Sequence, residues 1–175
     1  AAILRRNIHH LGYDNNFTIY DQSDALAVVK NVITDMNLDI KRFEPKYFYY
    51  MISNSKNKLI SHQDIDKLSN TYMDEMLPDI FKEYQIRLKE SNAVDFDDLL
   101  ILPLELFKVK PSILDYYQNK FKYVLVDEYQ DTNKPQFHFI YNIAKKHQDI
   151  CVVGDDDQSI YGWRGADISN ILDFN

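Results

Sequence analysis

The stretch YVLVDEYQDTN at residues 123–133 is the most informative about the fold, because a short apolar run passes directly into a polar turn. A second apolar run, ICVVG at 150–154, follows after a segment with helical periodicity. Continuous apolar runs of this length are typical of strands that are buried on both faces of a parallel sheet. Strand, helix and strand within about thirty residues indicate a parallel crossover unit. The second half of the chain is therefore predicted to be α/β.

The first ninety or so residues are predicted to be mostly helical. Apolar residues recur at helical spacing after Ser23, a candidate cap, and again between residues 73 and 88, and both stripes are expected to face a core. Pro45 is placed to open a further helix. The segment FTIYD at 17–21 alternates like a strand, and residues 53–61 are predicted to be a polar connection.

Three further segments, all after residue 94, are predicted to be helical. Asp95 followed by Asp98 resembles a capping arrangement for a helix that continues to about residue 106. Pro111 is placed to start another helix, and the periodicity between 133 and 146 predicts the crossover helix. The expected fold is a parallel sheet with a mostly α-helical inserted subdomain.

The composition limits the possible classes of protein. The chain has 175 residues, 45% of them hydrophobic, with 4 Gly and 5 Pro. This is enough apolar material for one sizeable core, or for a core with a small inserted lobe. No apolar run reaches the roughly 18 residues of a membrane span, and arginines interrupt the N-terminal segment where a signal peptide is apolar. We therefore expect a cytoplasmic protein that does not interact with a membrane.

The cysteine and histidine content and the net charge narrow the possible classes of protein further. Cys151 is the single cysteine and the five histidines are scattered, so neither a disulfide within the chain nor a metal site of His and Cys is expected. The formal net charge is −7, whereas a protein that holds DNA by bulk charge is usually basic. Nucleic-acid binding must therefore be argued from local motifs.

Adjacent carboxylates, Asp127 and Glu128, end the first apolar strand. This is the pattern of a Walker B element, in which one acid holds Mg²⁺ through its water shell and the next orients a water for attack on a phosphate. The alternative is an acidic helix start, in which Asp131 and Thr132 cap the helix that follows. The residues alone leave both interpretations open.

The second strand ends in a longer polar stretch. Gln158 is expected beside the carboxyl pair if the two strands are neighbours, where a neutral amide contacts both a phosphate oxygen and a water. Tyr161, Trp163 and Arg164 have the composition of a platform on which single-stranded nucleic acid stacks. Core packing is the alternative for these aromatic residues, and a solvated turn is the alternative for the three aspartates before Gln158.

Three strings occur in a characteristic order: DFDDLL at 95–100, VLVDEYQDTN at 124–133 and VVGDDDQSIYGWRGADI at 152–168. In this order and spacing they resemble the superfamily 1 DNA helicases of the UvrD, Rep and PcrA type, and most closely the PcrA branch. The segments ILRRNIHHLGYDNNFTIYD and KRFEPKYF are also similar to the region after that family's motif Ib. The resemblance covers essentially the whole chain.

The resemblance implies a partial RecA-like (P-loop NTPase) sheet that works with ATP and Mg²⁺. Asp127 matches the acid that coordinates Mg²⁺, Glu128 the residue that activates the hydrolytic water, and Gln158 the motif III glutamine that couples the γ-phosphate to DNA. The family's single-stranded DNA path is matched by Phe96, Tyr161, Trp163 and Arg164. For Phe96 a core aromatic remains the alternative.

The resemblance also implies a domain organisation. Residues 1–12 and 95–175 would belong to motor domain 1A, and residues 13–94 would form the helical subdomain 1B inserted into it. Candidates for contact with duplex DNA in this subdomain are Lys41, Arg42, Lys56 and Lys58.

The sequence departs from the family in two respects. No glycine precedes a lysine, so the phosphate-binding loop G-x-x-x-x-G-K-[ST] is absent. The family's second motor domain, with its arginines, is also missing from the 175 residues. We expect a fragment that runs from motif Ib through motif III and is inactive alone. Its parent would be an ATP-dependent 3′ to 5′ helicase acting on single strands and single-strand/duplex junctions in DNA repair and plasmid replication.

Two other functions compete with this expectation. One is the motor part of a helicase-nuclease recombination subunit, and the other is a non-catalytic DNA-binding or scaffolding module. A fragment of this kind would also expose 150–154 as a sheet edge, through which copies of the chain could self-associate.

Overall fold

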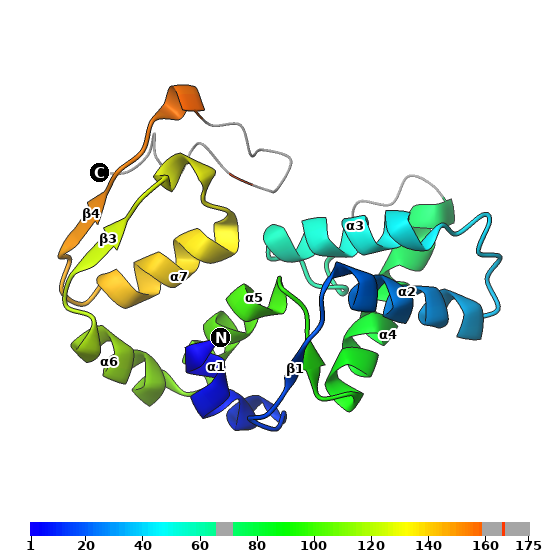
Figure 1. Cartoon of the computed structure of the whole chain (residues 1–175), viewed down its shortest axis with the longest axis horizontal. Coiled ribbons are helices and arrows are strands. Elements are labelled where there is room, and N and C mark those ends of the chain that lie inside the picture. Colours follow the sequence, from blue (N-terminus) through cyan, green and yellow to red (C-terminus); the bar gives the residue numbers. More distant parts are fainter. Residues whose placement is uncertain (66–71, 159–165, 167–175) are drawn as a thin grey trace. The chain divides into compact units, whose positions relative to one another are not determined.

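The computed structural model describes residues 1–65, 72–158 and 166, and it divides the chain into two compact units, Ala1–Leu99 and Leu100–Asn175. Both helices and small parallel sheets are present, so the chain has a mixed α/β fold (Figure 1). No helix within the described ranges has the length and apolar character needed to cross a membrane. The assignment of 1–12, 13–94 and 95–175 to subdomains stays a prediction.

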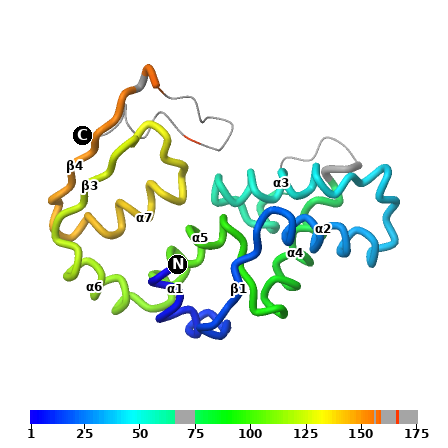
Figure 2. The backbone as a smooth tube through the Cα atoms, in the orientation of Figure 1, coloured from blue at the N-terminus to red at the C-terminus, as the bar shows by residue number. Residues whose placement is uncertain are grey.

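In the N-terminal unit, a pair of short parallel strands brackets a set of helices. Thr18 lies opposite Ala93 in the pairing of β1 (Thr18–Ile19) with β2 (Ala93–Val94). The chain before β1 forms α1 (Ala2–Asn7) and the 3₁₀ helix η1 (Ile8–Leu11). Between the strands lie α2 (Gln22–Asp35), α3 (Pro45–Asn57) and α4 (Tyr72–Glu90), which pack beside one another in Figure 2. The helical set is therefore an insertion between paired strands.

The core of this unit comes from the apolar faces of the three helices. Its fully buried side chains include Val29 and Ile33 from α2, Phe48 from α3, and Tyr84 and Leu88 from α4. The apolar stripes seen in the sequence therefore face a common core, as predicted.

The start of α2 and the end of α3 differ from the sequence-based expectation. Asp21, rather than Ser23, caps α2: its Oδ1 accepts hydrogen bonds from the backbone N–H groups of Ser23 at 2.8 Å and Asp24 at 2.9 Å. Asp24 completes the capping box. α3 continues to Asn57, so the polar connection predicted for 53–61 is shorter than expected.

The C-terminal unit contains the parallel crossover predicted from the sequence. β3 (Val124–Val126) pairs in parallel with β4 (Ile150–Val152), and α7 (Lys134–Ala144) connects them (Figure 1). α5 (Asp98–Val109), which starts at the end of the N-terminal unit, and α6 (Pro111–Lys120) precede the sheet. The 3₁₀ helices η3 (Tyr129–Asp131) and η4 (Asp156–Gln158) follow β3 and β4 directly. Both strands therefore end in polar turns.

The prediction that both faces of this sheet are buried is wrong for the chain as it stands. Val124 and Val126 are partly buried, but Leu125 between them is 74% exposed and Cys151 of β4 is exposed. Successive side chains of a strand point to opposite faces, and α7 lies against β3 on one of them. The other face has no covering helix among the described residues of this unit.

Candidate functional site

The turn after β3 presents two acids to solvent. Asp127 and Glu128 are both exposed, and Asp127 Oδ1 accepts a hydrogen bond from the backbone N–H of Glu128 at 2.9 Å. Glu128 adopts the left-handed conformation with φ of 51° and ψ of 42°. For a residue with a side chain this conformation costs about 1–2 kcal/mol, and such costs persist where surrounding contacts enforce them, often at functional sites.

The ends of β3 and β4 lie together, as predicted from the parallel crossover. The backbone N–H of Val153 donates to Val126 O at 2.8 Å, and that of Tyr129 donates to Val153 O at 3.0 Å. These bonds hold the turn that contains Glu128 against the segment that follows β4. They supply the contacts that enforce its backbone conformation.

A glutamine to which no sequence motif assigns a role lies at the centre of this turn. Gln130 is only 1% exposed. Its Nε2 donates to Glu128 Oε2 at 2.7 Å, and its Oε1 accepts from the backbone N–H of Asp155 at 3.1 Å. The side chain thus connects an acid after β3 with the backbone after β4.

Gln158 contacts Asp155 rather than the acidic pair. Its Nε2 donates to Asp155 Oδ2 at 2.7 Å and its backbone N–H donates to Asp155 O at 3.1 Å. Gln158 is exposed, and no hydrogen bond among the described residues joins it to Asp127 or Glu128. The connection from Gln158 to Glu128 passes through Asp155 and Gln130.

A cavity of about 330 Å³ lies beside the acidic turn, within the size range of small-molecule sites. Its rim carries Asp127, Glu128 and Asp131, and its apolar lining includes Val126 and Phe139. Asp131 Oδ1 is buried and has no hydrogen-bond partner among the described residues. The cavity therefore combines an apolar wall with acceptors that are free to take a ligand.

The acidic turn does not owe its composition to helix capping. Asn133 caps α7 by accepting from the backbone N–H of Gln136 at 3.0 Å, and Gln136 completes the capping box. Thr132 Oγ1 donates to Tyr129 O at 2.7 Å instead. The alternative in which Asp131 and Thr132 cap this helix is therefore wrong.

The charges on the turn are not neutralised within the described part of the chain, where no Lys or Arg forms an ion pair with Asp127 or Glu128. Nor does any group of three or more His, Cys, Asp or Glu converge as a metal site in the described ranges. Mg²⁺ in nucleotide sites uses one or two carboxylates, with waters and phosphate oxygens as its other ligands. Asp127 beside the cavity therefore fits a Mg²⁺ that arrives with a nucleotide.

A second acidic cluster, in the N-terminal unit, is fully paired. Lys56 is 3% exposed, and its Nζ donates to Asp95 Oδ2 at 2.6 Å and to Asp98 Oδ1 at 2.8 Å. The Tyr84 hydroxyl also donates to Asp95 Oδ2, at 2.8 Å. Lys56 is therefore wrong as a candidate for contact with DNA, because its ammonium group is buried in an ion-pair cluster.

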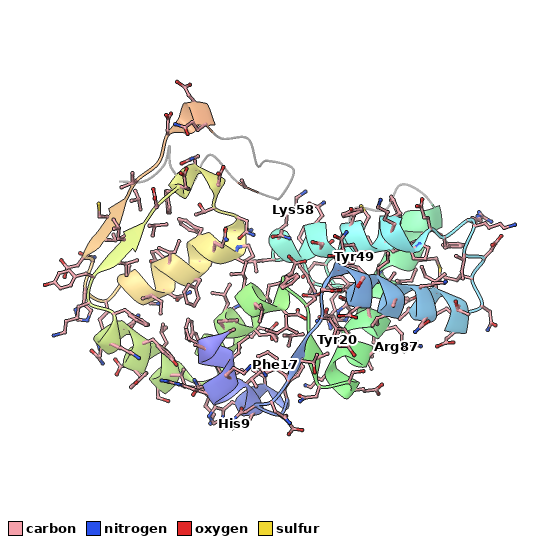
Figure 3. The ribbon with its side chains drawn as sticks, in the orientation of Figure 1. His9, Phe17, Tyr20, Tyr49, Lys58 and Arg87 are labelled. Atoms are coloured by element: carbon pink, nitrogen blue, oxygen red, sulfur yellow. The ribbon has the colours of Figure 1, made fainter. Side chains whose placement is uncertain are left out.

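The other basic candidates remain on the surface. Lys41, Arg42 and Lys58 are exposed, and Figure 3 labels Lys58 just beyond the end of α3. Their contact with duplex DNA stays a prediction. Arg87 of α4, also labelled there, is engaged by Asp35 at 2.7 Å and Glu83 at 2.9 Å.

Burial and charge shift the pKa values of this cluster in different directions. Burial raises the pKa of Asp98 to about 6, and the neighbouring charge of Asp95 adds to the rise against the opposing effect of Lys56. Burial also opposes ionisation of Asp95, but Lys56 and its hydrogen bonds hold that pKa below its usual value. Burial disfavours the charged form of Lys56, yet both carboxylates keep its pKa raised. One lysine and two aspartates balance their charge when Asp98 carries the proton.

Between these buried aspartates, Phe96 points outward with 59% of its surface exposed. The capping arrangement predicted here is confirmed, since the Asp98 N–H donates to Asp95 Oδ1 at 2.8 Å and the Asp95 N–H donates to Asp98 Oδ2 at 3.3 Å. The alternative of a core aromatic is wrong for Phe96, while a role in binding DNA stays a prediction. The other predicted DNA-path residues, Tyr161, Trp163 and Arg164, lie outside the described residues.

The sequence also matches a known family over its entire length. The model of the UvrD/REP helicase N-terminal domain matches residues 1–175. The chain therefore belongs to the UvrD/REP helicase family, within the N-terminal domain.

Curated relatives agree with this membership. The chain is 50% identical over 174 residues to the ATP-dependent DNA helicase PcrA of Staphylococcus epidermidis (strain ATCC 35984) and 49% identical over 174 residues to that of Staphylococcus aureus (strain Mu50). Both alignments cover 99% of this chain and 24% of the relative. The chain thus spans about a quarter of the length of these helicases.

Proposed function

We propose that this chain supplies the nucleotide-hydrolysing edge of an ATP-dependent DNA helicase motor, on a partial RecA-like sheet. The observation that carries the proposal is the acidic turn after β3, where Asp127 and Glu128 are exposed beside a cavity and pair with no cation among the described residues. Both acids are open to a ligand that brings its own positive charge, and the left-handed conformation of Glu128 is a strained backbone of the kind often kept at functional sites.

Each acid has a distinct task in this proposal. Asp127 Oδ1 is engaged by the Glu128 N–H, which leaves its other oxygen for a water of the Mg²⁺ shell. When bound, Mg²⁺ with ATP supplies a phosphoryl group whose charge the metal offsets. Glu128 orients the attacking water and takes up its proton. Gln158, bonded to Asp155, contacts the γ-phosphate and links it to DNA.

Single-stranded DNA and single-strand/duplex junctions are the proposed substrates. Phe96 supports this proposal, because an exposed ring held between two fixed aspartates is available for a base to stack on. Tyr161, Trp163 and Arg164 extend the same path by the family resemblance. Movement in the 3′ to 5′ direction, action in DNA repair and plasmid replication, and a cytoplasmic location complete the proposal.

Hydrolysis also needs a phosphate-binding loop, and the 175 residues contain no G-x-x-x-x-G-K-[ST]. We propose that the chain alone does not turn over ATP. Experiments on activity therefore use a full-length protein. By this we mean a polypeptide as long as the helicase relatives that contains this sequence.

Self-association of the 175-residue chain is proposed through β4. Among the described residues β4 pairs only with β3, and Cys151 on it is exposed while Val153 just beyond it is 52% exposed. Sedimentation at several concentrations should show dimers that weaken when Val153→Lys places a charge near the edge. A strictly monomeric chain would contradict this part of the proposal.

The experiment that tests the proposed function is Glu128→Gln in the full-length protein. Replacing the carboxylate with an amide keeps the shape but removes the proton acceptor, so ATP turnover should fall by about 100-fold or more. The control is Glu90→Gln, at the exposed end of α4, which should leave turnover unchanged. Near-normal turnover in Glu128→Gln would refute the assignment.

A further inference from the structure

We propose that Gln130 is a positioning residue that fixes the Glu128 carboxylate and couples it to the segment that carries Gln158. This inference rests on the proposed function, because it matters only if Glu128 acts on the hydrolytic water. Gln130 is not itself a lining residue of the cavity, and the one lining residue that its side chain hydrogen-bonds is Glu128. Its role is therefore exerted through Glu128.

The burial and bonding of Gln130 carry the first step. A glutamine side chain has one acceptor oxygen and two donor hydrogens, and burying them costs free energy unless they are hydrogen-bonded. Gln130, at 1% exposure, uses its Nε2 toward Glu128 Oε2 and its Oε1 toward the Asp155 N–H. The amide is thus fixed from both ends and holds its orientation rigidly.

The chemistry of Glu128 explains why an amide suits this place. An exposed glutamate samples several rotamers, whereas the 2.7 Å bond from Gln130 to Oε2 fixes one oxygen and leaves Oε1 for a water. A hydrogen bond to an ionised acceptor is roughly twice as strong as one between neutral groups. A lysine or arginine here would neutralise the carboxylate and weaken it as a base, but a neutral amide orients it without doing so.

The same side chain begins a continuous connection to motif III. Asp155 gives its backbone N–H to Gln130, and its Oδ2 accepts from Gln158 Nε2 at 2.7 Å. Three hydrogen bonds therefore link Glu128, Gln130, Asp155 and Gln158 in series. A displacement of Gln158 by its ligands shifts Asp155, and the shift reaches the glutamate through a buried, inflexible amide.

A purely structural role would also use these contacts, as a brace between the ends of β3 and β4. Kinetics separate the two roles, because a brace affects the folded fraction whereas a positioning residue affects the rate of each folded molecule. Gln118 provides a matched control in the same unit. It is 7% exposed, and its Nε2 donates to the backbone Asn142 O at 2.7 Å, away from the strand ends.

The test measures ATP turnover and folded fraction in the full-length protein carrying Gln130→Met, Gln130→Glu or Gln118→Met. Gln130→Met removes both hydrogen bonds at similar volume. Gln130→Glu keeps an acceptor for the Asp155 N–H but loses the donor to Glu128. We expect both Gln130 variants to lower kcat per folded molecule by about 10- to 100-fold with KM for ATP changed by less than about threefold. Gln118→Met should leave both constants unchanged.

A double variant makes the test specific to Glu128. If Gln130 acts through that carboxylate, Gln130→Met added to Glu128→Gln should slow turnover no further. Additive losses of turnover in the double variant, or a normal kcat in the folded Gln130 variants, would overturn the inference. The proposed function would still stand if Glu128→Gln alone lowers turnover. Should Gln130→Met fail to fold, Gln130→Glu decides the question. Normal turnover in Glu128→Gln would instead refute the proposed function and this inference with it.

Discussion

The carboxylates of Asp95 and Asp98 lie buried against Lys56 in the N-terminal unit, whereas those of Asp127 and Glu128 are exposed at the end of β3 in the C-terminal unit. The first pair shares one ammonium group at 2.6 and 2.8 Å. The second pair has no ion-pair partner among the described residues, and Glu128 instead receives an amide hydrogen from Gln130. The two acidic pairs thus differ in burial, in charge balance and in the type of donor they meet.

Burial and pairing separate structural acids from functional ones in this fold. A buried charge is tolerated only when it is paired and hydrogen-bonded, so a buried carboxylate with its own lysine is committed to the fold. An exposed carboxylate costs little to leave unpaired and can exchange water for a ligand. Substitutions should therefore affect stability at the first pair and chemistry at the second.

The largest expected effect on stability comes from Lys56→Met. This substitution leaves Asp95 and Asp98 buried without their cation, which should lower the free energy of unfolding by about 3–5 kcal/mol. Lys58→Met is the matched control, since Lys58 is exposed two residues further along, and should change it by less than about 0.5 kcal/mol. Urea unfolding of both variants measures the difference, and equal effects would erase the contrast between the two pairs.

A smaller effect is the pH dependence that Asp98 adds to stability. Its pKa is about 6 in the folded protein against an ordinary value of 3.8. Between these values the folded protein holds a proton that the unfolded chain has lost, so this contribution to stability falls as the pH rises. The free energy of unfolding of the wild type, minus that of Asp98→Asn, should therefore decrease from about pH 4 to about pH 7.

Unfolding curves at several pH values check this prediction. A difference that stays flat, or that increases with pH, would mean that Asp98 is ionised throughout and that the cluster carries a net negative charge. The window lies above the range in which Asp95 titrates, because the pKa of Asp95 is lowered. The readout therefore reports on Asp98 alone within this pair.

Substitution of Phe96 tests whether the buried pair of aspartates contributes to DNA binding by holding this exposed ring in place. Phe96→Ala should weaken binding of oligo-dT to the full-length protein by about 5- to 150-fold, the equivalent of 1–3 kcal/mol for one stacked base. Stability should change little, because the ring is 59% exposed. Tyr123→Ala removes another exposed aromatic, at 82%, and serves as the control. Equal affinities of the two variants would remove Phe96 from the proposed DNA path.

Most of the framework of the site could be predicted from the sequence. The apolar runs predicted β3 and β4, the crossover predicted their parallel pairing, and Asp95 with Asp98 predicted the capping arrangement. These features succeed because they depend on local patterns. The prediction that both sheet faces are buried is wrong, because burial of the second face needs a covering layer. The local pattern of two strands and one helix does not supply that layer.

Lys56 and Gln130 show two different limits of prediction from local patterns. The prediction of a polar connection at 53–61 places Lys56 on the surface, yet α3 continues to Asn57. The spacing of Phe48, Ile52 and Lys56 at every fourth residue was the signal that places the lysine on the buried face. For Gln130 no such periodic signal exists, because it lies in the short 3₁₀ helix η3 that follows the left-handed Glu128.

The most direct test of the contrast is one matched pair of substitutions, Asp127→Asn and Asp95→Asn, measured as Mg²⁺-dependent ATP turnover per folded molecule in the full-length protein. Asp127→Asn should lower turnover by about 100-fold or more, because it removes the proposed link to the Mg²⁺ shell. Asp95→Asn should reduce the folded fraction, yet leave the turnover of each folded molecule within about threefold of the wild type. Normal turnover in Asp127→Asn, or an equal loss in Asp95→Asn, would contradict the division between a chemical and a structural acidic pair.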